Sequence, residues 1–416
     1  MTPPVRREFL KTGGLALAAV GMGLTHKPAF TMSKQNSETA PADTPLPIGR
    51  EELDQRVDRA RSLMSKNNLD MILLTGGTSM KYFTGVTWRR SERTFAWLLP
   101  IDSEPIWVCP AFERDRAEER TEPNADIRIW QEDESPYELI SDFLKKTKSS
   151  KRKLGVEETV RYFVTEGISK ASNNVKIVSA NRIVNGCRGI KTTKEIELLR
   201  YINKVTLEVI RFSFKEMKNG MTQGELSGVL SSEYAKRGLR GWALVLFGPN
   251  AAFPHGTKNP ELLSSGKLVL VDTGTSIHGY QSDITRTTVF GEPTKRQLEV
   301  WSTVREAQSM ALEKAKPGVK AGDVDKVARS VIVKAGFGKG YSVFTHRLGH
   351  GIGMDGHEFP YLVKGNKLKL QAGMTFSNEP GIYIRGELGV RLEDIMHITE
   401  SGAELLTQQS ESLLSA

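Results

Sequence analysis

The chain has 416 residues, of which 38% are hydrophobic, so it is long enough for two globular domains that each bury a core. Its formal net charge is +9, but the charges lie in runs of mixed sign and no zinc-finger, homeodomain or RNP-type motif occurs, which argues against a nucleic-acid partner. Two cysteines, Cys109 and Cys187, are too few for a disulfide framework or a thiolate metal site, and their spacing leaves open whether they pair.

Residues 1–45 are predicted to be an export signal and a linker. Paired Arg6 and Arg7 precede a run of small and apolar residues over 13–24, a pattern that looks like a twin-arginine signal. That run is short for a hydrocarbon core of ~30 Å, although an uncleaved anchor or a buried helix is an alternative reading. The polar stretch around residues 31–47 offers little to bury and is typical of a linker. We therefore expect export to the periplasm and no stable membrane span in the mature protein.

Residues 46–187 are predicted to form an α/β domain. Leu53, Val57, Ala60 and Met64 recur at helical spacing, and the apolar run DMILLTG that follows is typical of a strand. Further strands are expected at TFAWLLP, EPIWVC, DIRIW and RKLGVEE, with helices around 113–119 and 137–145. Alternation of helices and strands indicates one layered α/β unit.

Residues 188–416 are predicted to form a second domain of α+β type. A long helix begins after Thr193, with Glu195 and Glu197 in its first turn, near the positive end of the helix dipole. Further helical patterns are GELSGVLSSEYAKRG, KRQLEVWSTVREAQSMALEKAK and VDKVARSVIVKAG. Between them lie strands, so we expect helices that flank a curved antiparallel sheet.

Two aspartates lie in a predicted hairpin of this second domain. A strand over Leu268–Val271 ends on Asp272, and a polar turn leads into a second strand that carries Asp283. Two carboxylates that face each other in a hairpin repel unless cations lie between them. Two turn or capping aspartates are the alternative interpretation.

Histidines and two further carboxylates cluster after the hairpin. His346, His350 and His357 lie close together, with glycines between them that let the backbone come near a buried centre. The segments FSNEPGIYI and GVRLEDIMHIT are predicted strands, each with one inward carboxylate, Glu379 and Glu393. Carboxylates and one imidazole suit Mn²⁺, Fe²⁺, Co²⁺ or Zn²⁺ in pairs and exclude a thiolate zinc site.

A resemblance to a known family rests on Asp272, Asp283, His350, Glu379 and Glu393. Their order, with the GHGIG and NEPGIY contexts, resembles the five-ligand pattern of the pita-bread metallopeptidases, which include methionine aminopeptidase, Xaa-Pro aminopeptidase and prolidase. The resemblance covers most of residues 190–408 closely and the preceding domain more loosely. It implies a pita-bread catalytic domain at 188–416 after a creatinase/prolidase-type N-terminal α/β domain at 46–187. It also implies two divalent ions per chain, with Mn²⁺ first and Co²⁺, Zn²⁺ or Fe²⁺ as alternatives, and a homodimer.

The resemblance further implies roles for residues beside the ligands. Arg391, two positions before the last ligand, resembles the proline-directed members and not the methionine aminopeptidases. The implied catalytic residues are His255, His357, Glu379 and Arg391, and the implied substrate-binding residues are His255, His346 and Tyr383. Glu379 would transfer the proton of the attacking water, while His255 or His357 would stabilise the oxyanion and the leaving nitrogen.

The sequence thus predicts an exported dinuclear metallopeptidase that cleaves the bond before proline, as an Xaa-Pro aminopeptidase or an Xaa-Pro dipeptidase. Its partner would be a small peptide or a small amide. A metal-dependent non-peptidase on the same fold, similar to ectoine hydrolase or to a dimethylsulfoniopropionate lyase, is the first alternative. A metal-free C–N hydrolase similar to creatinase and a non-catalytic binding module are less favoured, because all five ligand positions are retained.

Overall fold

The computed structural model describes residues 43–146, 153–172 and 174–414, and these described residues belong to one compact unit. The predicted twin-arginine signal therefore lies outside the described residues. Within the described part, no helix is both long and apolar enough to cross a membrane.

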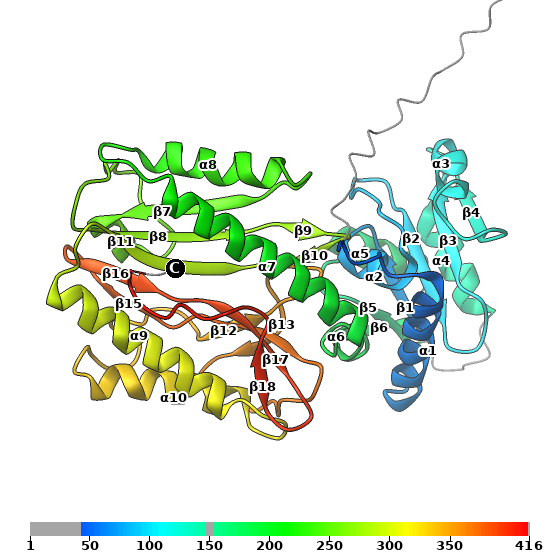
Figure 1. The fold of residues 1–416 in the computed structure, drawn as a ribbon. Helices are drawn as coiled ribbons and strands as arrows, with labels where there is room; N and C mark the ends of the chain where they lie inside the picture. The colour runs from blue at the N-terminus through cyan, green and yellow to red at the C-terminus, as the bar shows by residue number, and fades with distance from the viewer. Residues whose placement is uncertain (1–42, 147–152, 173, 415–416) are drawn as a thin grey trace, which may run out of the picture. The chain divides into compact units, whose positions relative to one another are not determined.

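The described N-terminal part of this unit contains a mixed six-stranded sheet in the order β4-β3-β2-β1-β5-β6 (Figure 1). The strands are β1 Met71–Thr75, β2 Ala96–Pro100, β3 Ile106–Pro110, β4 Asp126–Trp130, β5 Lys153–Val156 and β6 Lys176–Ser179. The helices are α1 Arg50–Lys66, α2 Thr78–Thr84, α3 Arg114–Glu118, α4 Pro136–Lys145, α5 Tyr162–Ala171 and α6 Asn181–Arg188. Strands β1, β2 and β3 are apolar at nearly every position because both faces of the sheet are covered by helices.

The predicted strands and helices of the N-terminal domain are found, but β6, α2, α5 and α6 have no counterpart in the sequence prediction. Helix α2 is short, and α5 and α6 each contain a glycine, which weakens the helical pattern. In α5 the glycine has a packing reason, since a Cβ at Gly167 would lie 2.4 Å from the ring of Tyr137 on α4. Tertiary packing, which no local pattern reports, fixes this helix.

Both cysteines lie in the interior of the fold. Cys109 and Cys187 are both buried and unbonded. Burial raises the pKa of each thiol to about 12, so neither thiolate is available at neutral pH.

The basic segment over residues 88–93 is anchored in the domain by Trp88. This residue is buried, and its ring is stacked on that of Phe95 with the centroids 3.8 Å apart.

Helix α7, Thr193–Lys215, opens the second half of the unit. Its start is set by a capping box in which the Thr192 hydroxyl accepts from the Glu195 N–H and the Glu195 carboxylate accepts from the Thr192 N–H. Glu195 therefore caps the helix directly, beyond the dipole effect expected from the sequence. It also accepts a 2.7 Å hydrogen bond from the Tyr280 hydroxyl.

The second half is built from antiparallel sheets between two helical layers (Figure 1). Its remaining helices are α8 Gln223–Ala235, α9 Lys295–Lys314 and α10 Ala321–Lys334. Its strands are β7 Trp242–Phe247, β8 Lys267–Gly274, β9 Ser276–Ile277, β10 Tyr280–Gln281, β11 Ile284–Phe290, β12 Gly349–Gly351, β13 Glu358–Leu362, β14 Thr375–Asn378, β15 Gly381–Ile384, β16 Leu388–Arg391, β17 Asp394–Ile398 and β18 Ala403–Leu405. Helices α7 and α8 pack on the β11-β8-β7 sheet, whereas α9 and α10 share a core with the strands that follow them.

The strands that carry the two glutamates differ from the prediction. Each was expected to run through its carboxylate, but the first breaks at Glu379–Pro380 and the second at Leu392–Glu393. The breaks arise because β14 pairs with β17, while β15 and β16 pair with each other in a separate sheet. Both glutamates consequently lie where the chain passes from one sheet to another.

Candidate metal centre

The hairpin of β8 and β11 brings the two aspartates close together. Thr285 pairs with Asp272 across the hairpin, and Asp283 lies two residues before Thr285. Asp272 and Thr285 share one face as cross-strand partners, and Asp283, directly before β11, brings a carboxylate oxygen within 4.8 Å of one of Asp272. The predicted approach of the two aspartates is therefore found.

His350 reaches the same place from β12, where its neighbours must be glycines. A Cβ at Gly349 would lie 1.9 Å from the backbone oxygen of Ser377, and one at Gly351 would lie 2.6 Å from the backbone oxygen of Glu358. The glycines thus allow strand backbones to approach each other and so seat the histidine between them. The imidazole Nε2 lies 3.3 Å from Glu379 Oε1 and 3.8 Å from Asp283 Oδ2.

The potential ligand atoms of the described residues form three groups: Asp283, His350 and His357 make up one, and the other two share Glu393. Oxygens of Asp272, Asp283 and Glu393 lie within 4.8 Å of one another, and so do ligand atoms of His350, Glu379 and Glu393. Glu393 belongs to both groups. An arrangement of this kind suits two cations that lie side by side and share one carboxylate.

The charges of the site fit divalent cations. Burial, together with the charges of neighbouring carboxylates, raises the pKa of Asp283 and of Glu393 well above the ordinary range. Asp272 Oδ1 is buried and accepts no hydrogen bond from a donor group among the described residues. Asp283 could donate to Asp272 only in its protonated form. Bound cations would relieve the crowding of negative charge and supply the missing partner of Asp272.

Glu379 differs from the other acids of the site. Burial alone would raise the pKa of this carboxyl, but the hydrogen bond with His350 and the charges of His346, His350 and Arg391 lower it to about 2. Its Oε1 also accepts a 3.0 Å hydrogen bond from the Ser377 hydroxyl. Glu379 is therefore held as a carboxylate, in an orientation set by its neighbours.

Arg391 contacts the aspartate side of the site. Arg391 lies two positions before Glu393 in the sequence, but its guanidinium donates a 2.6 Å hydrogen bond to Asp272 Oδ2. It also donates to the hydroxyls of Thr285 and Tyr383 at 3.0 Å. Glu393 instead accepts a 2.6 Å hydrogen bond from the Thr285 hydroxyl. Residues 391 and 393 lie on either side of the break between β16 and β17, so they do not belong to one strand, and the Thr285 hydroxyl bridges them.

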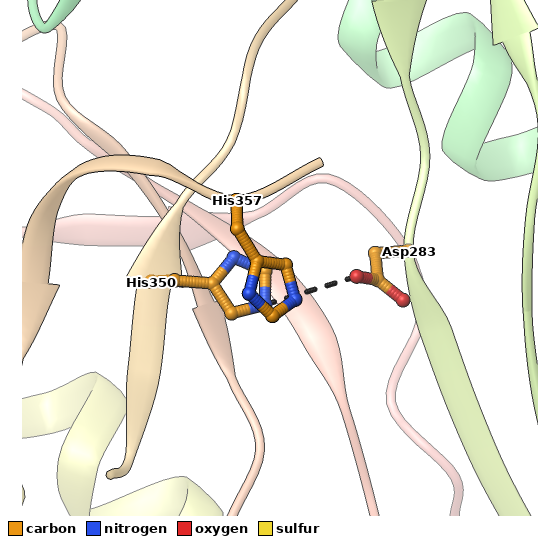
Figure 2. A group of neighbouring side chains, drawn as sticks. All are labelled: Asp283, His350 and His357. Carbon is orange, nitrogen blue, oxygen red and sulfur yellow. Dashed lines mark ion pairs between the residues drawn. The ribbon is translucent and has the colours of Figure 1, made fainter. Parts of the chain in front are cut away.

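His357 lies over His350 at the edge of the site. Figure 2 shows the two imidazoles one above the other, with the carboxylate of Asp283 directed at them; the ring centroids are 3.6 Å apart. Burial and the charge of His350 lower the pKa of His357 to about 4. His357 is therefore a neutral imidazole at pH 7, able to donate or accept a hydrogen bond without carrying charge.

A cavity of about 570 Å³ brings most of the predicted residues together. It is lined by Trp242, Leu244, Pro254, His255, Asp272, Gln281, Ser282, Asp283, His346, Arg347, His350, Gly356, His357, Glu379, Arg391 and Glu393. Tyr383, predicted to bind substrate, does not line the cavity in the described structure. Its hydroxyl is 2.7 Å from His346 Nε2 and accepts from Arg391, so Tyr383 supports these two residues from behind.

Sequence reasoning missed three residues of the site. Thr285 holds Glu393 and Arg391 together, and its position two residues after Asp283 was the available signal. Trp242 and Arg347 line the cavity, and Arg347 follows directly after the predicted His346. The guanidinium of Arg347 has no carboxylate partner among the described residues, whereas Trp242 offers an apolar wall.

Comparisons with known proteins place the fold among peptidases. Residues 197–400 match metallopeptidase family M24, and residues 56–190 match the creatinase/prolidase N-terminal domain. The chain is 34% identical over 365 residues to an Xaa-Pro dipeptidase of Lactobacillus helveticus. That alignment covers 86% of this chain and 98% of the relative.

Solved structures agree with these matches. Dipeptidase PepE from Mycobacterium ulcerans superposes with a TM-score of 0.83 at 29% identity, over 89% of this chain and 99% of that one. A prolidase from Thermococcus sibiricus gives a TM-score of 0.79 at 29% identity, over 88% of this chain and 100% of that one. The predicted fold class, a creatinase/prolidase-type domain followed by a pita-bread domain, is confirmed.

Proposed function

The chain belongs to metallopeptidase family M24 and is a peptide hydrolase, and from this premise we propose that it is an exported Xaa-Pro dipeptidase that uses two divalent ions. One observation carries the proposal: the two overlapping ligand groups that share Glu393 lie in the wall of a cavity. Relatives with the name Xaa-Pro dipeptidase align over 98–100% of their length, which supports the proline-directed specificity. Export rests on the paired arginines of the N-terminal sequence, and a homodimer remains a prediction.

Two sets of residues would hold the ions. Asp272, Asp283 and Glu393 would bind one, while His350, Glu379 and Glu393 would bind the other. Four carboxylates and one imidazole are ligands that Mn²⁺ accepts readily, which is why we propose Mn²⁺ first. Divalent ions in such a site supply a hydroxide nucleophile near neutral pH and polarise the scissile carbonyl.

The residues around the ions would have separate roles in the reaction. Glu379 stays ionised and is placed to accept the proton of the nucleophile. His357 is neutral and can donate a hydrogen bond to the oxygen that becomes negative, and His255 lies exposed at the same cavity, where it can reach the leaving nitrogen. Arg391 acts through Asp272, whose orientation it fixes.

The cavity wall supports a dipeptide substrate over a longer peptide. A volume of about 570 Å³ is in the range of small-molecule sites. Trp242 and Leu244 offer apolar surface for a proline ring. The guanidinium of Arg347 is available for the carboxylate of a dipeptide, because no acid among the described residues pairs with it.

A substrate panel tests the proposal. Protein that lacks the predicted signal is loaded with Mn²⁺ and incubated with Xaa-Pro dipeptides, Xaa-Pro-Yaa tripeptides and small amides, and the released amine is measured. We expect the dipeptides to be cleaved with the highest kcat/KM. Preference for the tripeptides would instead indicate an Xaa-Pro aminopeptidase. Intact peptides together with consumption of a small amide or betaine would replace the peptidase with the non-peptidase alternative.

A further inference from the structure

Four polar side chains with no exposed surface lie behind the candidate metal centre. They are Arg286 on β11, Gln308 on α9, Asn378 at the end of β14 and Asp394 at the start of β17. None of them lines the cavity within the described structure. Burial of this much polarity costs stability unless every group is hydrogen-bonded, so the cluster calls for a physical reason.

Hydrogen bonds join the four residues into one network. Arg286 donates to Asp394 Oδ1 at 2.6 Å and to the backbone oxygen of Glu393 at 2.7 Å. The amide of Gln308 donates to Asp394 Oδ2 at 3.0 Å and to the backbone oxygen of Asn378 at 3.2 Å. Asn378 returns a 2.9 Å hydrogen bond from its side-chain amide to the backbone oxygen of Gln308.

The network holds the two strand breaks at which the glutamates lie. Asn378 directly precedes Glu379, Asp394 directly follows Glu393, and Asn378 and Asp394 are cross-strand partners of β14 and β17. Neighbouring residues of a strand point to opposite faces. Asn378 and Asp394 are thus directed at α9, while the adjacent glutamates are directed into the site.

Gln308 is the residue that connects the two breaks. A single amide nitrogen bridges Asp394 on one strand and the Asn378 backbone on the other. Helix α9 therefore contacts, through one side chain, the chain segments of both glutamates that the proposed ions need. Gln308 Oε1 also accepts a 3.0 Å hydrogen bond from Gln409, which limits its rotation.

We propose that Gln308 is a positioning residue that sets the separation of Glu379 and Glu393 and thereby the affinity for divalent ions. The inference rests on the proposed function, since it concerns the ions of that site. Residues that hold metal ligands through hydrogen bonds typically change metal affinity by about 10- to 100-fold when they are replaced. Gln308 donates no hydrogen bond to the ligand side chains themselves. It acts through Asn378 and Asp394, the residues next to Glu379 and Glu393.

The test compares two variants on the same helix. Gln308→Met keeps the approximate volume and removes both donated hydrogen bonds. Thr303→Val is the matched control, because the Thr303 hydroxyl donates only to the backbone oxygen of Glu299 in its own helix. The dissociation constant for Mn²⁺ is measured by calorimetry on protein freed of metal, and the melting temperature of the metal-free form is recorded beside it.

We expect Gln308→Met to weaken Mn²⁺ binding by about 10- to 100-fold while Thr303→Val leaves it unchanged. Mn²⁺ binding by Gln308→Met as tight as that of wild type overturns the inference and leaves the proposed function standing. Wild-type protein that binds no Mn²⁺ overturns both. Should Gln308→Met not fold, Gln308→Asn takes its place, because the shorter amide cannot reach both Asp394 Oδ2 and the Asn378 backbone oxygen from the same helix position. Unchanged Mn²⁺ affinity in that variant overturns the inference equally.

Discussion

Replacement of Arg391 by methionine should destabilise the metal-free protein strongly. Arg391 is 3% exposed and is the ion-pair partner of Asp272. Methionine fills much of the same space but donates no hydrogen bond. The variant leaves Asp272, whose side chain is 15% exposed, without a countercharge and removes a donor from Thr285 and Tyr383.

The magnitude follows from the cost of a buried charge that loses its partner. Removal of one member of a buried ion pair costs about 3–5 kcal/mol, because the other charge stays desolvated. When divalent ions are bound, their charge compensates Asp272 and the loss should shrink. Mn²⁺ is therefore predicted to raise the free energy of unfolding of Arg391→Met by more than it raises that of wild type.

Urea unfolding of both forms, with and without Mn²⁺, measures the effect. Arg200→Met is the control, because Arg200 and Glu404 form a pair at 2.8 Å whose side chains are 45% and 43% exposed. Exposed pairs of this kind contribute about 0–1 kcal/mol. If metal-free Arg391→Met loses no more than Arg200→Met, or loses the same with and without Mn²⁺, Arg391 is not the countercharge of Asp272.

Three further predictions concern substrate, pH and export. Arg347→Met should raise KM for Xaa-Pro dipeptides far more than for peptide amides that lack a free carboxylate, in steady-state kinetics of both substrates; equal effects would remove the proposed contact. Burial would raise the pKa of Glu358, but the charges of Lys191 and Arg188 lower it below its ordinary value of 4.5. The folded state therefore binds fewer protons than the unfolded state near and below pH 4.5, and the stability of the protein falls as the pH drops through that range. Glu358→Gln should accordingly lose less stability than wild type as the pH falls through 4.5 and below in urea unfolding, and an identical pH dependence would contradict this. Replacement of Arg6 and Arg7 together with lysine should retain the precursor in the cytoplasm on cell fractionation, and a double variant that is still exported would show another route.

Local patterns in the sequence predicted many of the elements, whereas the set of five ligands was implied by the family resemblance and stays a prediction. The period of apolar residues predicted α1 and β1, and the clustering of His350 with neighbouring glycines predicted a site on β12. These signals are local, since each depends on residues within one element. The same holds for Thr192 and Glu195, whose spacing encodes the capping box of α7.

Local patterns could not predict which elements and side chains contact each other in the folded protein. The break at Glu379 depends on which strands pair, since β14 pairs with β17 and skips β15 and β16, which pair with each other. Arg391 and Asp272 are 119 residues apart, so nothing in the local sequence distinguishes Asp272 from Glu393 as its partner. Gln308 reads as one polar residue in an amphipathic helix, and only the packed structure reveals what it contacts.

Metal content of active protein tests the central claim most directly. Wild-type protein purified gently and analysed for metals should contain close to two divalent ions per chain and should cleave Xaa-Pro dipeptides. Glu393→Ala should lose metal and activity together, because Glu393 belongs to both ligand groups. Wild-type protein with a metal content near zero and full activity would contradict the dinuclear site.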